Sequence, residues 1–459
     1  MRTYDLDGGK LCDVLPAALR ADILSGALAP GERLPSKRRM AEHHGISVNT
    51  VQNAYEQLIA EGYIEARARS GYFVADLPAQ LPVAPTKEGG EPLAEDPPLL
   101  DLSANTTDSS RFPFSLWARL MRRTLAEEAE HLLSPLPAAG APALQEAIAA
   151  YLREGRGISV EPCQIVIGAG TEYLYQLLVQ LLGRERHYGL ENPGHSKVAR
   201  IYTVNGVTFS PVDVDESGVD PLALDALGVD VLQISPNHHF PTGVVTPVTR
   251  RRALLHWMQG GDRYIIEDDY DSEFRFVGRP IPPLFGMDTS DRVIYVNTFS
   301  KTIAPSMRIS YMVLPRPLLV RYRQLLGFYA CPVPAFEQYT LTRFLREGHF
   351  ERHLHRMRTF YRARRDEVID MLQNAPFAAY LRIREADAGL HFLVELLVDK
   401  TDAELRAVFE KAGIRVSFLG DYRINGDHPD TRTVLVNYSG IDLRALARGI
   451  DRLSALIRD

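Results

Sequence analysis

A single lysine, Lys301, follows a short apolar run and lies among hydroxyl side chains. The run Val293–Val296 is typical of a buried strand, which places the lysine in the loop that follows. Burial lowers the pKa of an ammonium group, and such an amine can form an imine with a carbonyl cofactor. Thr298, Ser300 and Arg308 flank it with the donors that a phosphate requires. The alternative is an ordinary strand-end lysine beside a surface arginine.

Three further motifs with suitable side chains follow other predicted strands. Small residues at Ala169 and Gly170 precede a predicted helix, where backbone N–H groups can approach an anion. His195 offers a ring that could stack on an aromatic ligand. Asp268 and Tyr270 suit a heteroaromatic ring, with a carboxylate opposite a ring nitrogen and a phenol near a ring oxygen.

The pair His238–His239 also follows a predicted strand, and such a pair suggests a metal site. No third ligand lies at metal-binding spacing in the sequence, so we predict no metal.

The elements that must position these residues alternate between strands and helices from Asp101 onward. This alternation predicts an α/β fold with a mostly parallel sheet covered on both faces, whose ligands bind beyond the carboxyl ends of the strands. The predicted strands are 164–167, 187–190, 207–212, 231–234, 264–267 and 293–296, and the predicted helices are 117–130, 143–154 and 172–182.

Composition narrows the class of protein. The chain has 459 residues, which predicts more than one domain, and its net charge of −6 does not mark the whole chain as a nucleic-acid binder. Three widely spaced cysteines argue against a disulfide framework and favour a reducing cytoplasm. The N-terminus is too polar for a signal peptide, and no apolar run is long enough for a membrane span.

Residues 10–75 carry a second pattern. A helix ends before Gly26, Ser36 is an expected N-cap for a helix over 37–44, and Ser47 is an expected N-cap for a helix from Val48 to about Glu61. Two short strands, 63–66 and 71–75, then enclose a basic tip. This order predicts a helix-turn-helix followed by a β-hairpin wing.

This segment resembles the winged helix-turn-helix domain of the GntR family of bacterial regulators. The matching stretches are 30–36, 47–51, 54–58 and 61–64. Many members carry arginine where this chain has Val48, so base preference is not carried over. The resemblance implies DNA contacts from Ser36, Lys37, Arg38, Ser47, Asn49, Thr50, Gln52, Arg67 and Arg69.

Residues 101–459 resemble fold-type I aminotransferases, which use pyridoxal 5′-phosphate. The resemblance implies Lys301 as the lysine that forms the imine, Asp268 opposite the pyridine nitrogen, Tyr270 at the ring oxygen and His195 stacked on the ring. A carboxylate beside the pyridine nitrogen favours its protonated, electron-withdrawing form. The implied phosphate ligands are Ala169, Gly170, Thr298, Ser300 and Arg308.

A GntR-type head joined to an aminotransferase-like body is the architecture of the MocR (GabR-like) subfamily of GntR transcriptional regulators. We therefore predict a DNA-binding domain over 1–76, a proline-rich linker over 77–100 and a body over 101–459 whose small subdomain begins at about 334. The resemblance implies a homodimer in which each DNA-binding domain packs near the partner's body.

Two positions depart from the catalytic aminotransferases. The asparagine that those enzymes place against the ring oxygen is Phe240 here, and the tyrosine that reaches the partner subunit's cofactor falls near Pro135. Loss of a hydrogen bond to the reacting group costs catalysis more than cofactor retention.

The predicted function is a pyridoxal-phosphate-dependent, DNA-binding regulator that senses an amino compound or a B6 vitamer through Lys301. The alternative is a working aminotransferase with an accessory DNA-binding head, and weak transamination is compatible with either. An effector carboxylate would bind Arg432 or, as second choice, Lys197. A long arginine-rich helix after Pro334 either extends a DNA path or is a solvated interdomain helix.

Overall fold

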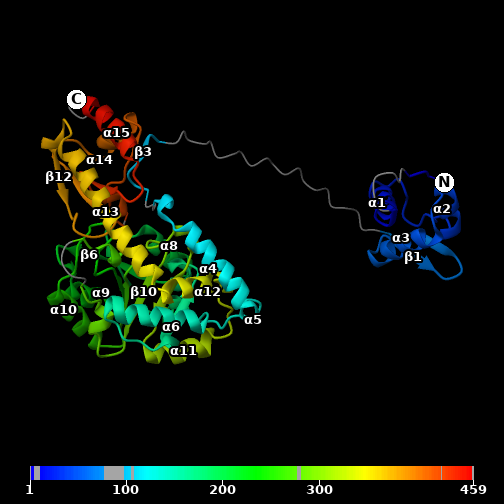
Figure 1. The fold of residues 1–459 in the computed structure, drawn as a ribbon, viewed down its shortest axis with the longest axis horizontal. Coiled ribbons are helices and arrows are strands. Elements are labelled where there is room, and N and C mark those ends of the chain that lie inside the picture. Colours follow the sequence, from blue (N-terminus) through cyan, green and yellow to red (C-terminus); the bar gives the residue numbers. More distant parts are fainter. Residues whose placement is uncertain are drawn as a thin grey trace. The chain divides into compact units, whose positions relative to one another are not determined.

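The computed structural model describes residues 2–4, 11–76, 98–104, 108–276, 281–424 and 426–456. The chain divides into two compact units between residues 96 and 97. Figure 1 shows the smaller unit in blue and the larger unit in cyan to red. Most of the predicted linker, residues 77–97, lies outside the described residues.

The N-terminal unit is a three-helix domain with a β-hairpin. Its elements are α1 (Leu11–Leu24), α2 (Lys37–His44), α3 (Val48–Ala60), β1 (Ile64–Arg67) and β2 (Gly71–Val74). The Ser36 and Ser47 side chains accept hydrogen bonds from the backbone N–H groups of Arg39 and Thr50, so both predicted N-caps are present. Gly45 ends α2 at a φ of 63°, a conformation that glycine adopts without strain.

The larger unit is built on an eight-stranded sheet with the order β4-β11-β10-β9-β8-β5-β6-β7. The pairs β10–β9, β9–β8, β8–β5 and β5–β6 are parallel, while β11 is antiparallel to both β10 and β4. The strands are β4 (Ile165–Gly168), β5 (Tyr188–Asn192), β6 (Phe209–Asp215), β7 (Gly218–Val219), β8 (Val231–Ile234), β9 (Tyr264–Asp268), β10 (Val293–Thr298) and β11 (Ser310–Val313).

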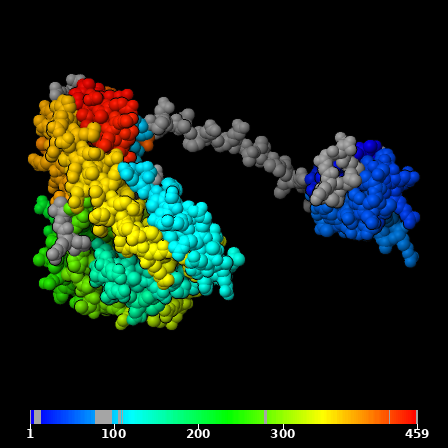
Figure 2. Space-filling view, in the orientation of Figure 1, coloured from blue at the N-terminus to red at the C-terminus, as the bar shows by residue number. Residues whose placement is uncertain are grey.

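Helices cover both faces of this sheet, which is why its strands read as continuous apolar runs. On β10, Tyr295 packs into one core beneath α4, α6 and α12, whereas Ile294 and Val296 pack into another beneath α7 and α11. Figure 2 shows α4, in cyan, beside the yellow helices, and α12 contacts α4 directly. The helices are α4 (Phe114–Glu127), α5 (Ala129–Leu132), α6 (Pro142–Tyr151), α7 (Thr171–Leu182), α8 (Ser196–Val204), α9 (Pro221–Leu227), α10 (Val248–Gln259), α11 (Arg316–Leu326) and α12 (Ala335–Arg346).

A smaller layer completes this unit. The antiparallel sheet β12-β13-β15 and the short pair β14–β3 pack with α13, α14 and α15 around a separate apolar core. These elements are β3 (Leu100–Asp101), α13 (His349–Gln373), β12 (Leu381–Arg384), β13 (His391–Leu396), α14 (Asp402–Lys411), β14 (Ile414–Arg415), β15 (Thr433–Asn437) and α15 (Leu443–Leu456).

The structure corrects one prediction: the arginine-rich helix after Pro334 is two helices, α12 and α13, separated by Gly348 at a φ of 67°. Arg358, Arg362 and Arg365 donate to the backbone carbonyls of Glu273, Phe276 and Ala386. These arginines therefore tie the helix to the rest of its unit. No helix in the described part of the chain combines the length and apolar character needed to span a membrane.

Candidate functional site

A cavity of about 450 Å³ lies where several strands of the large sheet end. Its lining includes Leu190 from β5, Asp268 from β9 and Thr298 from β10, so it occupies the edge of the sheet where the sequence predicts ligand binding. Seven of the nine predicted cofactor residues line it: His195, Asp268, Tyr270, Thr298, Ser300, Lys301 and Arg308.

Lys301 lies in the turn that follows β10 and lines the cavity. Burial lowers the pKa of its amine to about 8, against an opposing attraction from Asp271. At neutral pH an appreciable fraction of this amine is therefore unprotonated, as nucleophilic attack on a carbonyl requires.

Asp268 is the last residue of β9, and one of its two carboxylate oxygens is buried without a hydrogen-bond partner in the described part of the chain. Its Oδ2 accepts a hydrogen bond from the Tyr175 hydroxyl, whereas its Oδ1 has no hydrogen-bond partner among the described residues. Burial raises the pKa of this carboxyl to about 7. A cationic N–H group at Oδ1 would satisfy both the missing hydrogen bond and the buried charge.

Two aromatic side chains border the same space. His195 caps α8, accepts a hydrogen bond from the Lys197 N–H, and lies 5.3 Å from the Phe240 ring. Burial lowers the pKa of His195 to about 4, so its ring is neutral near pH 7. The Tyr270 hydroxyl lies 3.2 Å from the Nδ1 atom of His238. Phe240 also lines the cavity. The position at which this chain has a phenylalanine in place of the aminotransferase asparagine therefore lies within the site.

The other end of the cavity has the composition of an anion site. Gly170 is the N-cap of α7 with a φ of 97°, and an added Cβ there would lie 2.2 Å from the Arg308 guanidinium. Ser300 Oγ is buried and lacks a partner within the described part of the chain. Thr298 Oγ1 is already engaged by the Ser300 N–H and the Ser310 hydroxyl. Of the two predicted hydroxyl ligands, Ser300 is therefore the more available.

The cationic side chains at this end of the cavity already have an anionic partner, the carboxylate of Glu172. Arg308 and Lys197 both form ion pairs with it, the latter at 3.1 Å. Although partial burial opposes ionisation, the hydrogen bonds from Arg308 and Lys197 lower the pKa of Glu172 to about 2. Glu172 is therefore ionised at any physiological pH.

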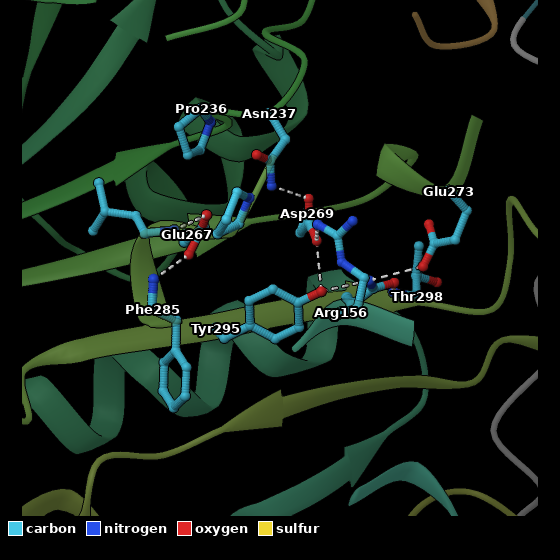
Figure 3. Close-up of polar contacts among 12 residues, drawn as sticks. Arg156, Pro236, Asn237, Glu267, Asp269, Glu273, Phe285, Tyr295 and Thr298 are labelled. Atoms are coloured by element: carbon cyan, nitrogen blue, oxygen red, sulfur yellow. Dashed lines mark hydrogen bonds and ion pairs between the residues drawn. The ribbon is translucent and has the colours of Figure 1, made fainter. Parts of the chain in front are cut away.

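The opposite side of β9 is fixed by a buried polar network. Consecutive side chains alternate across a strand, so Glu267 and Asp269 point away from the face that carries Asp268. Figure 3 shows Asp269 held by Arg156 and the Tyr295 hydroxyl, both at 2.6 Å. Such a network resists displacement, because breaking one buried pair leaves an uncompensated charge.

Three predicted positions are not part of the cavity lining. Ala169 and Gly170 are not among the cavity-lining residues, although Thr171 and Glu172 directly after them are. Arg432 does not line the cavity either, and its guanidinium lies 3.4 Å from Asp399. Lys197, the second choice for an effector carboxylate, does line it.

The structure also changes the argument about metals. The sequence offers no third ligand near His238. In the structure, Asp271 and His391 lie close to it although they come from other segments of the chain. One candidate ligand atom from each of the three residues lies within 4.8 Å of the other two. Tyr175, Glu172 and Asp271 were likewise missed as site residues. Each of these side chains contacts a residue that is distant in the sequence, and the spacing of residues along the chain does not reveal such contacts.

Most of the residues predicted to contact DNA lie on the exposed surface of the helix-turn-helix and wing. Ser36, Arg38, Ser47, Asn49, Arg67 and Arg69 are exposed, and Lys37, Thr50 and Gln52 are half-buried. Ser36 and Ser47 serve as N-caps, and Arg67 lies over the Phe73 ring at 4.5 Å. The helix N-termini thus present N–H groups and cations on one small domain, a combination suited to phosphate and base contacts.

Comparison with known proteins identifies both units. Residues 13–74 match the family described as bacterial regulatory proteins, gntR family, and residues 97–435 match aminotransferase class I and II. Solved structures of similar fold include the Pyrococcus horikoshii kynurenine aminotransferase, 23% identical with a TM-score of 0.68, over 78% of this chain and 90% of that chain. An archaeal alanine:glyoxylate aminotransferase is 25% identical with a TM-score of 0.68, over 78% of this chain and 90% of that chain.

Other similar proteins align with this chain across both of its units. The HTH-type transcriptional regulator YdeL of Bacillus subtilis is 35% identical, over 94% of this chain and 93% of the relative. The pyridoxine biosynthesis regulator PdxR of Corynebacterium glutamicum is 35% identical, over 89% of this chain and 88% of the relative. The probable rhizopine catabolism regulatory protein MocR of Rhizobium meliloti is 33% identical, over 95% and 91%. The chain therefore belongs to the MocR-like HTH-type transcriptional regulators, in which a GntR-type DNA-binding domain precedes an aminotransferase class I and II domain.

Proposed function

We propose that this regulator binds pyridoxal 5′-phosphate at Lys301 and that occupancy of the same cavity by a small molecule controls DNA binding by the N-terminal unit. The observation that carries the proposal is that one cavity is lined both by Lys301, whose amine has a lowered pKa, and by Asp268, one oxygen of which lacks a partner among the described residues. When bound, the cofactor supplies an aldehyde that condenses with amines and a ring that withdraws electrons.

The residues fit this cofactor. Asp268 would hold the pyridine nitrogen, Tyr270 the ring oxygen and His195 the ring face. Ser300, Arg308 and the N-terminus of α7 would hold the phosphate, with Thr298 as a further predicted ligand. Two atoms of this ligand set, Asp268 Oδ1 and Ser300 Oγ, have no hydrogen-bond partner in the described part of the chain. Both are therefore available to the cofactor.

We propose a B6 vitamer as the first candidate effector and an amino compound as the second. Among the described residues that line the cavity, Arg308 and Lys197 already pair with Glu172, and Lys301 is needed for the imine. An amino acid would need a further cation for its carboxylate, whereas the vitamer needs none beyond the phosphate site. The similarity to PdxR, named for pyridoxine biosynthesis, supports this order.

A working aminotransferase is the second candidate function, and the intact set of Lys301, Asp268 and Tyr270 around one cavity favours it. Phe240 in place of an amide counts against efficient turnover. A homodimer is also proposed, and Phe114, Leu133 and Phe328, which expose 69%, 85% and 77% of their surface, are candidates for its interface.

The experiment that tests the proposed function measures binding of the full chain to DNA from upstream of its own gene, by fluorescence anisotropy. We expect Arg38→Ala combined with Asn49→Ala to weaken binding by at least about tenfold, because the pair removes a phosphate contact and a base-edge contact. Cofactor absorbance should be unchanged. Adding pyridoxal phosphate or individual amines should shift the wild-type curve.

The matched control is Arg153→Ala, which removes an exposed arginine of the larger unit that forms an ion pair with Glu154. Equal DNA affinity of the double variant and the control would mean that the reading surface is elsewhere. Transaminase turnover at rates usual for enzymes, on the order of 10 per second, with no DNA fragment bound specifically, would replace the regulator by the second candidate.

A separate prediction concerns Glu172. Because its carboxylate pairs with the two cations nearest the phosphate site, an incoming phosphate must share or displace it. Replacing Glu172 with glutamine keeps the size of the side chain and removes its charge, so affinity for pyridoxal phosphate should rise about tenfold, equivalent to about 1.4 kcal/mol. Titration of the unloaded protein with cofactor measures this.

The control for this prediction is Glu161→Gln, which removes a carboxylate that pairs with Arg316 outside the cavity. Its cofactor affinity should equal that of the wild type. Weaker binding by Glu172→Gln would show instead that the carboxylate positions Arg308 for the phosphate.

A further inference from the structure

Helix α7 contributes three side chains to the cavity: Thr171, Glu172 and Tyr175. Residues three or four positions apart lie on the same face of a helix, so these three form one strip along α7. Glu172 pairs with Arg308 at the predicted phosphate end. Tyr175 lies one turn further along the helix and contacts Asp268 instead. The strip therefore reaches from the phosphate end to the residue predicted to lie opposite the pyridine nitrogen.

Tyr175 is a fixed hydrogen-bond donor. Its hydroxyl donates to the Oδ2 atom of Asp268, and the side chain is only 2% exposed. Its ring belongs to the apolar core that also contains Ile266 and Val296. Burial and the neighbouring Asp268 raise the pKa of this phenol well above its usual value, so the hydroxyl keeps its hydrogen. The position of the donor is thus set by core packing, before any ligand binds.

This contact leaves Asp268 with one acceptor to offer. Oδ2 is engaged by Tyr175, whereas Oδ1 is buried and has no partner among the described residues. The two oxygens belong to one planar carboxylate, so a donor fixed on Oδ2 also fixes the direction of Oδ1. A binding group held in this way by a neighbour pays less for its orientation when a ligand arrives.

Tyr175 also favours the charged form of Asp268. Burial and the carboxylates of Asp269 and Asp271 raise the pKa of Asp268, and the hydrogen bond from Tyr175 lowers it. An ionised carboxylate only accepts hydrogen bonds, whereas the neutral acid offers an O–H group. The other titratable groups that interact with Asp268 carry no positive charge: Glu191, Tyr202 and Tyr270.

We propose that Tyr175 is a positioning residue that holds Asp268 as an oriented, ionised acceptor and thereby makes the cavity selective for a heteroaromatic ring with a cationic N–H group. The inference rests on the proposed function, since a pyridine ring in this cavity is part of that proposal. The contact between Tyr175 and Asp268 is present without ligand, so part of the test needs no cofactor.

Two competing interpretations give Tyr175 another role. In the first, its hydroxyl binds the ligand directly, because Tyr175 lines the cavity. A phenol has a single hydrogen to donate, and Asp268 already receives it. In the second, Tyr175 only fills the core. A hydrogen bond to a charged group contributes more than one between neutral groups, so its loss should be felt beyond packing.

The test compares two probes by isothermal titration calorimetry of the unloaded full chain. They are pyridoxal 5′-phosphate and its deaza analogue, in which a C–H group replaces the ring nitrogen. Both carry the same aldehyde and phosphate, so the ratio of their dissociation constants isolates the contact at the nitrogen. We expect the wild type to prefer pyridoxal phosphate about 100-fold and Tyr175→Phe to lower this preference about tenfold, because Asp268 loses the donor that orients it and favours its charge.

The matched control is Tyr202→Phe, which removes the same atom from another buried tyrosine. The Tyr202 hydroxyl bonds to the side chain of Gln233 rather than to Asp268. The preference of this variant should therefore equal that of the wild type. An unchanged preference in folded Tyr175→Phe would refute the proposal, and so would an equal loss of preference in both tyrosine variants.

A double variant separates an effect through Asp268 from a direct contact with the ligand. Asp268→Asn removes the charged acceptor, so adding Tyr175→Phe to it should change the preference no further. An additional tenfold loss in the double variant would overturn the proposal in favour of direct binding by Tyr175. If Tyr175→Phe folds only in the Asp268→Asn background, that dependence itself supports a bond to a charged Asp268.

A measurement without cofactor separates this inference from the proposed function. At pH 8, Tyr175→Phe should lower the melting temperature of the wild type by at least about 1 °C more than it lowers that of Asp268→Asn, because only the wild type loses a bond to a charged acceptor. An equal decrease in both backgrounds would refute the proposal. If the wild type binds neither probe, the proposed function fails, while the melting temperatures still decide whether Tyr175 supports a charged Asp268.

Discussion

Lys301→Ala should abolish the visible absorption of protein saturated with pyridoxal phosphate and should weaken cofactor retention about 100-fold, equivalent to about 2.8 kcal/mol. Lys301 is a half-buried residue of the cavity lining, and burial lowers the pKa of its amine to about 8. Without it, the cofactor keeps only its non-covalent contacts. Spectrophotometry after dialysis measures both quantities, and the DNA-binding curve should no longer respond to pyridoxal phosphate.

The control is Lys197→Met, which removes the other cavity lysine but leaves Lys301 in place. Lys197 pairs with Glu172 at 3.1 Å, so this variant should retain the visible band. A band that survives in Lys301→Ala and disappears in Lys197→Met would reassign the imine to the second lysine. A DNA-binding curve of Lys301→Ala that still responds to pyridoxal phosphate would separate sensing from the imine.

Asp268→Asn should stabilise the unloaded protein at pH 8 while weakening its affinity for the cofactor. Burial raises the pKa of Asp268 from 3.8 to about 7. Because the folded pKa lies above the unfolded one, this group's contribution to stability is complete below about pH 4 and is lost as the pH rises through about 7. At pH 8 the folded protein therefore carries the full cost of a buried carboxylate, up to about 4 kcal/mol at about 1.4 kcal/mol per pH unit.

Asparagine carries no charge at any pH, and its amide oxygen can still accept the hydrogen bond from Tyr175. The expected result is a melting temperature at least about 2 °C above that of the wild type at pH 8, with the difference disappearing near pH 4. Differential scanning calorimetry of both proteins at each pH cancels the titration of all other groups. If the difference in melting temperature does not depend on pH, Asp268 does not have the raised pKa that this prediction requires.

The helix-turn-helix could be predicted to within about one residue because its signals are local. Ser36 and Ser47 each cap the helix that follows, and Gly45 ends α2 in a conformation that suits glycine, so the predicted span 37–44 is the observed α2. The strand β8 was likewise predicted at its observed bounds, 231–234, because an apolar run buried on both faces has clear ends. The family and the fold of both units followed from these elements and the strand-end motifs.

Contacts between distant segments could not be predicted in this way. Tyr175 and Asp268 are 93 positions apart, and nothing near either residue indicates that α7 turns a hydroxyl toward the end of β9. The same holds for His238 and His391, which meet only because β13 packs beside the loop after β8. The strand β11 was missed because it is antiparallel to both neighbours, outside the alternation of strands and helices on which the prediction relied.

The ion pairs of Glu172 bear on how such a regulator is tuned. If the phosphate displaces this carboxylate, the free energy of the lost pairs is subtracted from the affinity, and half-saturation moves to a higher vitamin concentration. An enzyme gains from a cofactor site that is always full. A sensor of the vitamin instead needs a site whose filling still varies over the concentrations found in the cell, and one acidic side chain at position 172 is enough to set that range.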